Sequence, residues 1–282
     1  MHVVRCATPQ TFLERARTIL VEQEACHNVL LGVPAALAAS PGPQTDGYFA
    51  VNVDDAGAVA GAAMMTPPHK VALSQMTRDG AVDLLIQDLR RWPSAPPGVH
   101  APEPLCTRVA AAWTRVTGQR CERLLRARMY QLELVRAPVG VPGRLRAATA
   151  ADRPILVAWI RAFAEEALGD RTAEEAAETV TRRLREPTGG FVLWEDDGPR
   201  TLAGYSGPTP HGIRVGPVYT PPAHRRRGYG SACVAGLSQS LLDRGYRFCF
   251  LLADAANPAA NLIYQRIGYE PVCDVGEYRF LT

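Results

Sequence analysis

Residues 215–244 read VGPVYTPPAHRRRGYGSACVAGLSQSLLDR and predict a strand, a basic loop and a helix in succession. The strand is expected over Ile213–Thr220, and Pro221-Pro222 ends it because proline has no N–H for a strand ladder. The helix is expected from about Ser231 to about Arg244. Three arginines therefore stand just before a helix N-terminus, where unpaired N–H groups and the helix dipole favour a bound phosphate.

The loop between strand and helix, Arg225-Arg226-Arg227-Gly228-Tyr229-Gly230, resembles the coenzyme A pyrophosphate loop of the GCN5-related N-acetyltransferase (GNAT) superfamily. The pattern of that loop is Arg/Gln-x-x-Gly-x-Gly/Ala. The resemblance implies that this loop and Ser231 hold the pyrophosphate, largely through backbone N–H groups. Glycine suits positions 228 and 230, where a side chain would meet the phosphate or strain the backbone.

The end of the preceding strand would also contact the cofactor if the resemblance holds. Backbone groups of Val218, Tyr219 and Thr220 would pair with the amides of pantetheine, like one more β-strand. Gly216-Pro217, directly before them, predicts a bulge or a local distortion of the strand.

A second segment, Asn257–Tyr269, is similar to the superfamily pattern Asn-x-x-(Asn/Ala)-x-x-x-Tyr-x-x-x-Gly-(Phe/Tyr). Asn257 caps a predicted helix that ends before Gly268. Asn261 and Tyr264 are three residues apart and so share one helix face. The resemblance implies that Asn257 and Asn261 contact the cofactor arm and that Tyr264 lies near the thioester sulfur.

The resemblance implies transfer of an acetyl group from acetyl-CoA, as co-substrate, to a primary amine by direct attack. Tyr264 would be the general acid for the leaving thiolate. A phenol has a pKa of about 10 and a thiol about 8.5, so full proton transfer is uphill by roughly 2 kcal/mol. We therefore expect a hydrogen bond to the sulfur, with late transfer.

The sequence leaves the general base open. Ala223 stands where many members of the superfamily carry an acid. His211 and His224, in loops, are candidates, and so are the adjacent acids Glu165 and Glu166 near the end of a predicted helix. Water is a further route for the proton.

Composition narrows the class of protein. The chain has 282 residues, of which 47% are hydrophobic, enough for two domains. A formal charge of +3 argues against nucleic-acid binding. No apolar run nears the roughly 20 residues of a membrane span, and no signal peptide is seen, so we expect a cytoplasmic protein. The seven scattered cysteines predict reduced thiols and no metal site.

The element order predicts an α/β fold (an α+β mixed sheet) made of two tandem GNAT-like units, each with a central splayed mixed sheet flanked by helices. The predicted parts are a degenerate unit 1–135, a Pro- and Gly-rich linker 136–143 and a catalytic unit 144–282. Phe248–Ala253 is expected to be a strand buried on both faces. Tyr269–Asp274 and Glu277–Leu281 are expected as two closing strands.

The first unit lacks the chemistry-bearing motifs. Residues 74–80 read SQMTRDG, without Arg-x-x-Gly-x-Gly, and the helix Cys106–Gly118 offers Trp113 where the second unit has Tyr264. We expect this unit to shape the acceptor pocket or to support the catalytic unit.

Two other functions remain open at this stage. A non-catalytic acyl-CoA-binding or sensing protein would keep the loop without turnover. A Rossmann nucleotide-binding domain is disfavoured, because the third glycine and the later acid of that fingerprint are absent. The acceptor is expected to be a small molecule rather than a protein, and the chain a monomer or a homodimer.

Overall fold

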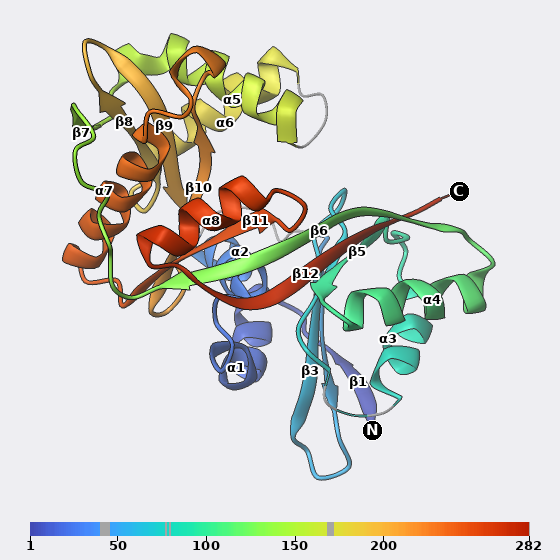
Figure 1. Ribbon diagram of the computed structural model, residues 1–282. Coiled ribbons are helices and arrows are strands. Elements are labelled where there is room, and N and C mark those ends of the chain that lie inside the picture. Colours follow the sequence, from blue (N-terminus) through green and yellow to red (C-terminus); the bar gives the residue numbers. More distant parts are fainter. Residues whose placement is uncertain (40–45, 77, 79, 168–171, 282) are drawn as a thin grey trace. The chain divides into compact units, whose positions relative to one another are not determined.

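The computed structural model describes residues 1–39, 46–76, 78, 80–167 and 172–281 (Figure 1). The chain forms two compact units, and neither is continuous in sequence. Unit 1 consists of Met1–Met129, Ala253–Asn257 and Pro271–Thr282, and unit 2 consists of Tyr130–Leu252 and Pro258–Glu270. The domain limits expected from the sequence, with a linker at 136–143, stay a prediction.

Unit 1 is a mixed sheet with strands in the order β1-β2-β3-β4-β5-β12-β6. β4 and β5 pair in parallel, whereas β1–β2, β2–β3, β3–β4 and β5–β12 are antiparallel pairs. Its elements are β1 (His2–Arg5), α1 (Pro9–Val21), α2 (Asn28–Ala39), β2 (Tyr48–Val53), β3 (Val59–Met65), β4 (Val71–Leu73), α3 (Ala81–Leu89), β5 (Gly98–Pro102), α4 (Leu105–Thr117), most of β6 (Cys121–Leu132) and most of β12 (Glu270–Phe280).

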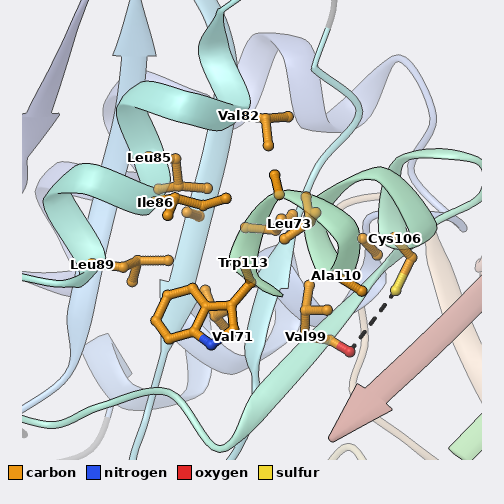
Figure 2. Close-up of a cluster of buried hydrophobic side chains, with 14 of the residues drawn as sticks. Val71, Leu73, Val82, Leu85, Ile86, Leu89, Val99, Cys106, Ala110 and Trp113 are labelled. Carbon is orange, nitrogen blue, oxygen red and sulfur yellow. Dashed lines mark hydrogen bonds between the residues drawn. The ribbon is translucent and has the colours of Figure 1, made fainter. Parts of the chain in front are cut away.

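Helices cover both faces of the unit 1 sheet, as the alternation along β2 shows. Tyr48 and Ala50 pack into a core with α3 and α4, whereas Phe49 and Val51 pack into a core with α1 and α2. Successive strand residues point to opposite faces, so a strand buried on both sides is apolar throughout. Figure 2 shows the α3–α4 core, in which Trp113 of α4 lies among aliphatic side chains.

Unit 2 has the strand order β6-β11-β10-β9-β8-β7. β10 and β11 are parallel, and the pairs β7–β8, β8–β9 and β9–β10 are antiparallel. Its elements are the end of β6, β7 (Arg144–Ala147), a 3-10 turn η1 (Ala150–Asp152), α5 (Arg153–Ala167), α6 (Ala173–Arg185), β8 (Gly190–Glu195), β9 (Pro199–Ser206), β10 (Gly212–Tyr219), a 3-10 turn η2 (Pro222–His224), α7 (Tyr229–Asp243), β11 (Phe248–Asp254, to Leu252) and α8 (Pro258–Ile267).

The two faces of the unit 2 sheet are covered by different helices. Leu193 of β8 and Leu202 of β9 pack with residues of α5 and α6. On the other face, Leu145 of β7 lies against Gly236 of α7, 3.2 Å from the position that a Cβ there would take. The capping box predicted by Thr172 and Glu175 is present at the start of α6.

Three details of the sequence prediction are wrong. β12 is one strand from Glu270 to Phe280 rather than two, because Gly276 continues the pairing by lying opposite Ala101 of β5, a strand that the sequence did not reveal. Leu252 of β11 is 37% exposed, so this strand is not buried on both faces to its end. α7 begins at Tyr229, two residues earlier than expected.

The cysteines are also not all reduced. Cys26, between α1 and α2, and Cys273, on β12, form a disulfide within unit 1, with Cα atoms 6.4 Å apart. The two cysteines are 247 residues apart in sequence, so their spacing gave no sign of the pair. The other five cysteines, Cys6, Cys106, Cys121, Cys233 and Cys249, are free thiols.

His27 closes the loop that follows β4 in unit 1. Its side chain is buried, its Nε2 accepts a hydrogen bond from the Gln75 N–H at 3.1 Å, and its Nδ1 lies 3.1 Å from the Leu20 carbonyl oxygen. Because Nε2 accepts, the proton sits on Nδ1 and the imidazole is neutral. Burial lowers the pKa of His27, and the hydrogen bond to Leu20 opposes that effect.

Acid should therefore destabilise unit 1 through His27. As the pH falls below about 6.5, His27 takes up a proton in the unfolded chain but not in the folded chain. The contribution of neutral His27 to the free energy of unfolding is therefore fully present above that pH and is lost below it. We expect the free energy of unfolding in urea to fall more between pH 8 and pH 5.5 for the wild type than for His27→Gln. His69→Gln, at an exposed position, should behave as the wild type. Equal losses in the wild type and His27→Gln would contradict this account.

Candidate cofactor and active site

The parallel strands β10 and β11 part within unit 2. Residues Gly212–Arg214 pair with Phe248–Phe250, and no pairing between the two strands follows within the described residues. On its other side β10 stays paired with β9 as far as Tyr219–Leu202. One edge of β10 beyond Arg214 is therefore free of a neighbouring strand.

A bulge stands where the strands part, as Gly216-Pro217 predicted. The β9–β10 register shifts between Val215 and Val218. Gly216 has φ +141°, which L side chains rarely adopt. Its carbonyl oxygen accepts a hydrogen bond of 2.6 Å from Nη1 of Arg183, on α6. The bulge is thus fixed from the α6 side of the sheet.

The end of β10 is held by hydroxyl groups. Thr201 of β9 donates to the carbonyl oxygen of Tyr219 at 2.7 Å, and its Oγ1 also lies within hydrogen-bond distance of the Thr220 hydroxyl. Val218 pairs with Ala203 and is part-buried. The three residues expected to line the pantetheine arm therefore have fixed backbones.

Arg225, the first arginine of the loop, is occupied by the protein itself. Its Nε donates to the Thr220 carbonyl oxygen at 2.8 Å, and its Nη2 lies 2.9 and 2.6 Å from the two carboxylate oxygens of Glu166, at the end of α5. The Tyr219 hydroxyl also donates to Glu166, at 3.1 Å. Burial, followed by this hydrogen bond, raises the pKa of Tyr219. Arg225 thus joins the strand end, the loop and α5.

Gly228 is required by the loop itself. It is the N-cap of α7 with φ +83°, a left-handed conformation. A Cβ there would lie 2.9 Å from Cγ2 of Val141, in the segment before β7. Gly230 is already helical, and a Cβ on it would lie 3.3 Å from the Thr220 hydroxyl. Glycine is therefore needed at 228 for the left-handed backbone and for the close approach of Val141, whether or not a ligand is bound.

The loop leaves a run of backbone N–H groups unpaired. Within the described residues, no hydrogen bond is made by the N–H groups of residues 226–231, and the first intrahelical donor of α7 is Ala232, to Gly228. The side chains of Arg226 and Arg227 are exposed beside this run. Tyr229 points away from it, since its hydroxyl donates to Asp196 in the β8–β9 turn. Free amides, a helix N-terminus and two exposed guanidinium side chains together fit a pyrophosphate.

Tyr264 lies on α8 among other tyrosines of unit 2. Its ring centroid is 6.3 Å from that of Tyr130 and 6.0 Å from that of Tyr269. Its hydroxyl has no hydrogen-bond partner in the part of the chain that the structure describes, although the residue is only part-exposed. Burial raises its pKa to about 12. Tyr264 therefore offers a neutral hydroxyl that is available as a donor.

The two asparagines of this segment differ in their surroundings. Asn261, one turn before Tyr264, accepts a hydrogen bond at its Oδ1 from the Tyr130 hydroxyl at 2.9 Å. Asn257 is exposed and directly precedes Pro258, the first residue of α8, and its N–H donates to the Asp254 carbonyl oxygen at 3.1 Å. The predicted start and end of this helix are confirmed.

The structure separates the candidates for the general base. Glu165 pairs with Arg161 at 2.7 Å, and Glu166 is bound to Arg225 and Tyr219. His211 is exposed. His224, in η2, keeps a buried Nδ1 without a hydrogen-bond partner among the described residues. Of the four candidates, His224 thus has a ring nitrogen that bonds to no described residue.

Unit 1 has a similar strand, loop and helix, but backbone N–H groups at the start of its loop bond to protein acceptors. β4, which pairs in parallel with β5, is followed in the chain by α3, whose N-cap Gly80 has φ +76°, as Gly228 has +83°. Here the Gln75 N–H is bound to His27 and the Ser74 N–H to the Ala62 carbonyl oxygen. Residues 77 and 79 of the predicted loop lie outside the described residues.

Sequence reasoning missed several residues of the site. Arg183 and Tyr130 belong to no recognisable motif. Arg183 has its role because α6 lies beside the bulge, and Tyr130 has its role because β6 lies beside α8. Glu166 was one of the candidates for the general base, and in the structure it pairs with the loop arginine Arg225. Only Arg225 within the loop pattern could have suggested an acidic partner.

Residues 208–279 match the model of a family described as FR47-like protein. No curated protein matches the chain. Among solved structures, a Drosophila protein is 13% identical with a TM-score of 0.67, covering 99% of this chain and 98% of its own. A GCN5-related N-acetyltransferase from Sphaerobacter thermophilus is 17% identical, with a TM-score of 0.62 and coverage of 98% and 95%.

A tandem GNAT protein from the clavulanic acid biosynthesis pathway is 15% identical, has a TM-score of 0.59 and covers 98% of this chain and 97% of its own. At these identities the comparison shows the fold. The chain has the tandem GNAT fold, with a mixed sheet flanked by helices, as the resemblance in its two motifs predicted.

No helix within the described residues is long and apolar enough to cross a membrane. The same residues contain no cluster of three or more His, Cys, Asp or Glu side chains that could hold a metal ion.

If Glu166 fixes the loop through Arg225, both residues should matter equally for cofactor affinity. We expect Arg225→Gln and Glu166→Gln each to weaken coenzyme A binding about fivefold, which is about 1 kcal/mol, and the double variant to be no weaker than either. Isothermal titration calorimetry measures this. Glu165→Gln is the matched control and should bind as the wild type does. A Glu166→Gln variant that also binds as the wild type does would disprove the coupling.

Proposed function

We propose that this protein is an N-acetyltransferase that uses acetyl-CoA as co-substrate and acetylates a primary amine on a small molecule. The observation that carries the proposal is the run of unpaired N–H groups at residues 226–231, placed directly after a strand that has parted from its neighbour. The tandem GNAT fold of the chain supports acyl transfer as the reaction class.

The residues fit the cofactor in two places. The N–H groups of residues 226–231, with the side chains of Arg226 and Arg227, would hold the pyrophosphate. The free edge of β10 at Val218, Tyr219 and Thr220 would pair with the pantetheine amides. When bound, acetyl-CoA supplies an activated acetyl thioester.

Tyr264 would act by donating a hydrogen bond to the leaving sulfur. Proton transfer from a phenol of pKa about 12 to a thiolate whose thiol has an ordinary pKa of about 8.5 is uphill by about 5 kcal/mol. The burial that raises this pKa therefore disfavours full transfer and leaves donation as the useful role. Asn261 and Tyr130, bonded to each other beside Tyr264, would hold α8 in place.

The first test is binding and turnover. The wild type should bind acetyl-CoA and release free thiol when mixed with amines of a broad library. Arg226→Gln with Arg227→Gln should weaken acetyl-CoA binding at least tenfold, and the loss should shrink as salt is raised, because exposed charges are screened. Arg247→Gln, at an exposed position beyond the other end of α7, is the control and should bind normally.

Two results would count against the proposal. Absence of acetyl-CoA binding by the wild type would remove the cofactor site. Binding without thiol release from any amine would favour the non-catalytic acyl-CoA-binding protein instead.

Replacement of the Tyr264 hydroxyl should affect turnover rather than binding. We expect Tyr264→Phe to lower kcat at least tenfold, while the dissociation constant for acetyl-CoA stays within about twofold, because the ring contacts with Tyr130 and Tyr269 remain. Steady-state kinetics and calorimetry measure the two quantities. Tyr246→Phe, in the same unit, should leave both unchanged. Normal turnover in Tyr264→Phe would exclude this hydroxyl from the chemistry.

A further inference from the structure

Arg214, two residues before Gly216 at the bulge of β10, faces the side of the sheet that α5 and α6 cover. It pairs with Ser206 of β9, so the two side chains share a face. Leu202, on the same strand, packs with α5 and α6, and Gly204 lies against Arg183 of α6. Alternation along β9 places Ser206, and hence Arg214, on that face.

The guanidinium group of Arg214 has no direct partner in the described part of the chain, and the residue is part-exposed. It makes no hydrogen bond and no ion pair with any described residue. Its Nη2 lies 3.3 Å from where a Cβ on Gly207 would stand, so the side chain extends toward the end of β9. Burial lowers the pKa of Arg214, and the charge of Glu186, at the end of α6, opposes this effect.

A guanidinium group that no protein acceptor occupies remains available to an anion. A second guanidinium group, that of Arg183, reaches the same face and bonds to the Gly216 carbonyl oxygen. Two guanidinium groups thus reach this face beside the bulge, with the carboxylate of Glu186 as a nearby opposite charge. The planar fork of an arginine binds a carboxylate or a phosphate through two parallel hydrogen bonds, so the free fork of Arg214 suits such a group.

We propose that Arg214 binds an anionic group of the acceptor, a carboxylate above all, and so selects small amines that also carry a negative charge. This inference rests on the proposed acyl transfer, because an amine ligand is expected only if the protein acetylates amines. Two residues, about 7 Å of strand, separate Arg214 from Gly216. An acceptor held at its anionic end by Arg214 would extend its amine toward the place where β10 and β11 part.

Ligand-observed saturation-transfer NMR tests the proposal without requiring turnover. The probes are matched acid and amide pairs, glycine with glycinamide and β-alanine with β-alaninamide, and phosphoethanolamine with ethanolamine for the phosphate case. Each is added to the full chain in the presence of coenzyme A. The wild type should bind the anionic member of at least one pair at least fivefold more tightly than the neutral member.

This preference should disappear in Arg214→Gln and stay in Arg244→Gln. Arg244 is the matched control, since it is an exposed arginine that follows α7 and donates to the Tyr205 hydroxyl at 3.2 Å. An anionic preference confined to phosphoethanolamine would identify phosphate as the group that Arg214 binds. Equal binding of the anionic probes to Arg214→Gln and the wild type would overturn the proposal, and so would a wild type without any anionic preference.

Two further measurements separate this proposal from the proposed function. Coenzyme A affinity and the melting temperature of Arg214→Gln should match those of the wild type, which shows that the variant is folded and keeps its cofactor loop. If the wild type binds no acetyl-CoA, the acetyltransferase proposal fails, and the NMR comparison still decides whether Arg214 binds anions. If acetyl-CoA binds but the anionic preference is absent, only the role of Arg214 is lost.

Discussion

The parting of β10 from β11 after the Arg214–Phe250 pair is the constraint on which the site depends. A sheet normally satisfies the backbone groups of each interior strand on both sides. Here β9 continues to pair with one edge of β10, while the bulge at Gly216-Pro217 changes the register and the other edge is left without a strand. The same point is tied to α6 through Arg183, so the free edge is held open by a fixed backbone.

The three arginines of the loop beyond β10 have different roles. Arg225 pairs with Glu166 and donates a hydrogen bond to the Thr220 carbonyl oxygen, and these contacts fix where the loop begins. Gly228, in a left-handed conformation, starts α7 without a side chain cap. The amides of residues 226–231 are therefore left for a ligand, with Arg226 and Arg227 beside them. Unit 1 has the same left-handed glycine before α3, but His27 occupies the Gln75 amide that follows its strand.

Local chemistry determined how much of this could be predicted from the sequence. The end of β10, its bulge and the start of α8 were predicted correctly, because each is set by the backbone of a local proline-containing pair. These pairs are Pro221-Pro222, Gly216-Pro217 and Asn257-Pro258. The roles of Glu166, Arg183 and Tyr130 depend on contacts between elements far apart in the chain, which no spacing reveals. The disulfide between Cys26 and Cys273 was missed for the same reason. β5 was missed because Gly98–Pro102 is short and ends in proline.

Amide hydrogen exchange over residues 226–231, with and without acetyl-CoA, tests the central claim most directly. The account predicts fast exchange of these amides in the free protein, because they have no protein acceptor, and slower exchange on addition of acetyl-CoA, while the amides of β9 stay unchanged. Amides 226–231 that are already protected in the free protein, or that exchange equally fast with acetyl-CoA bound, would contradict it.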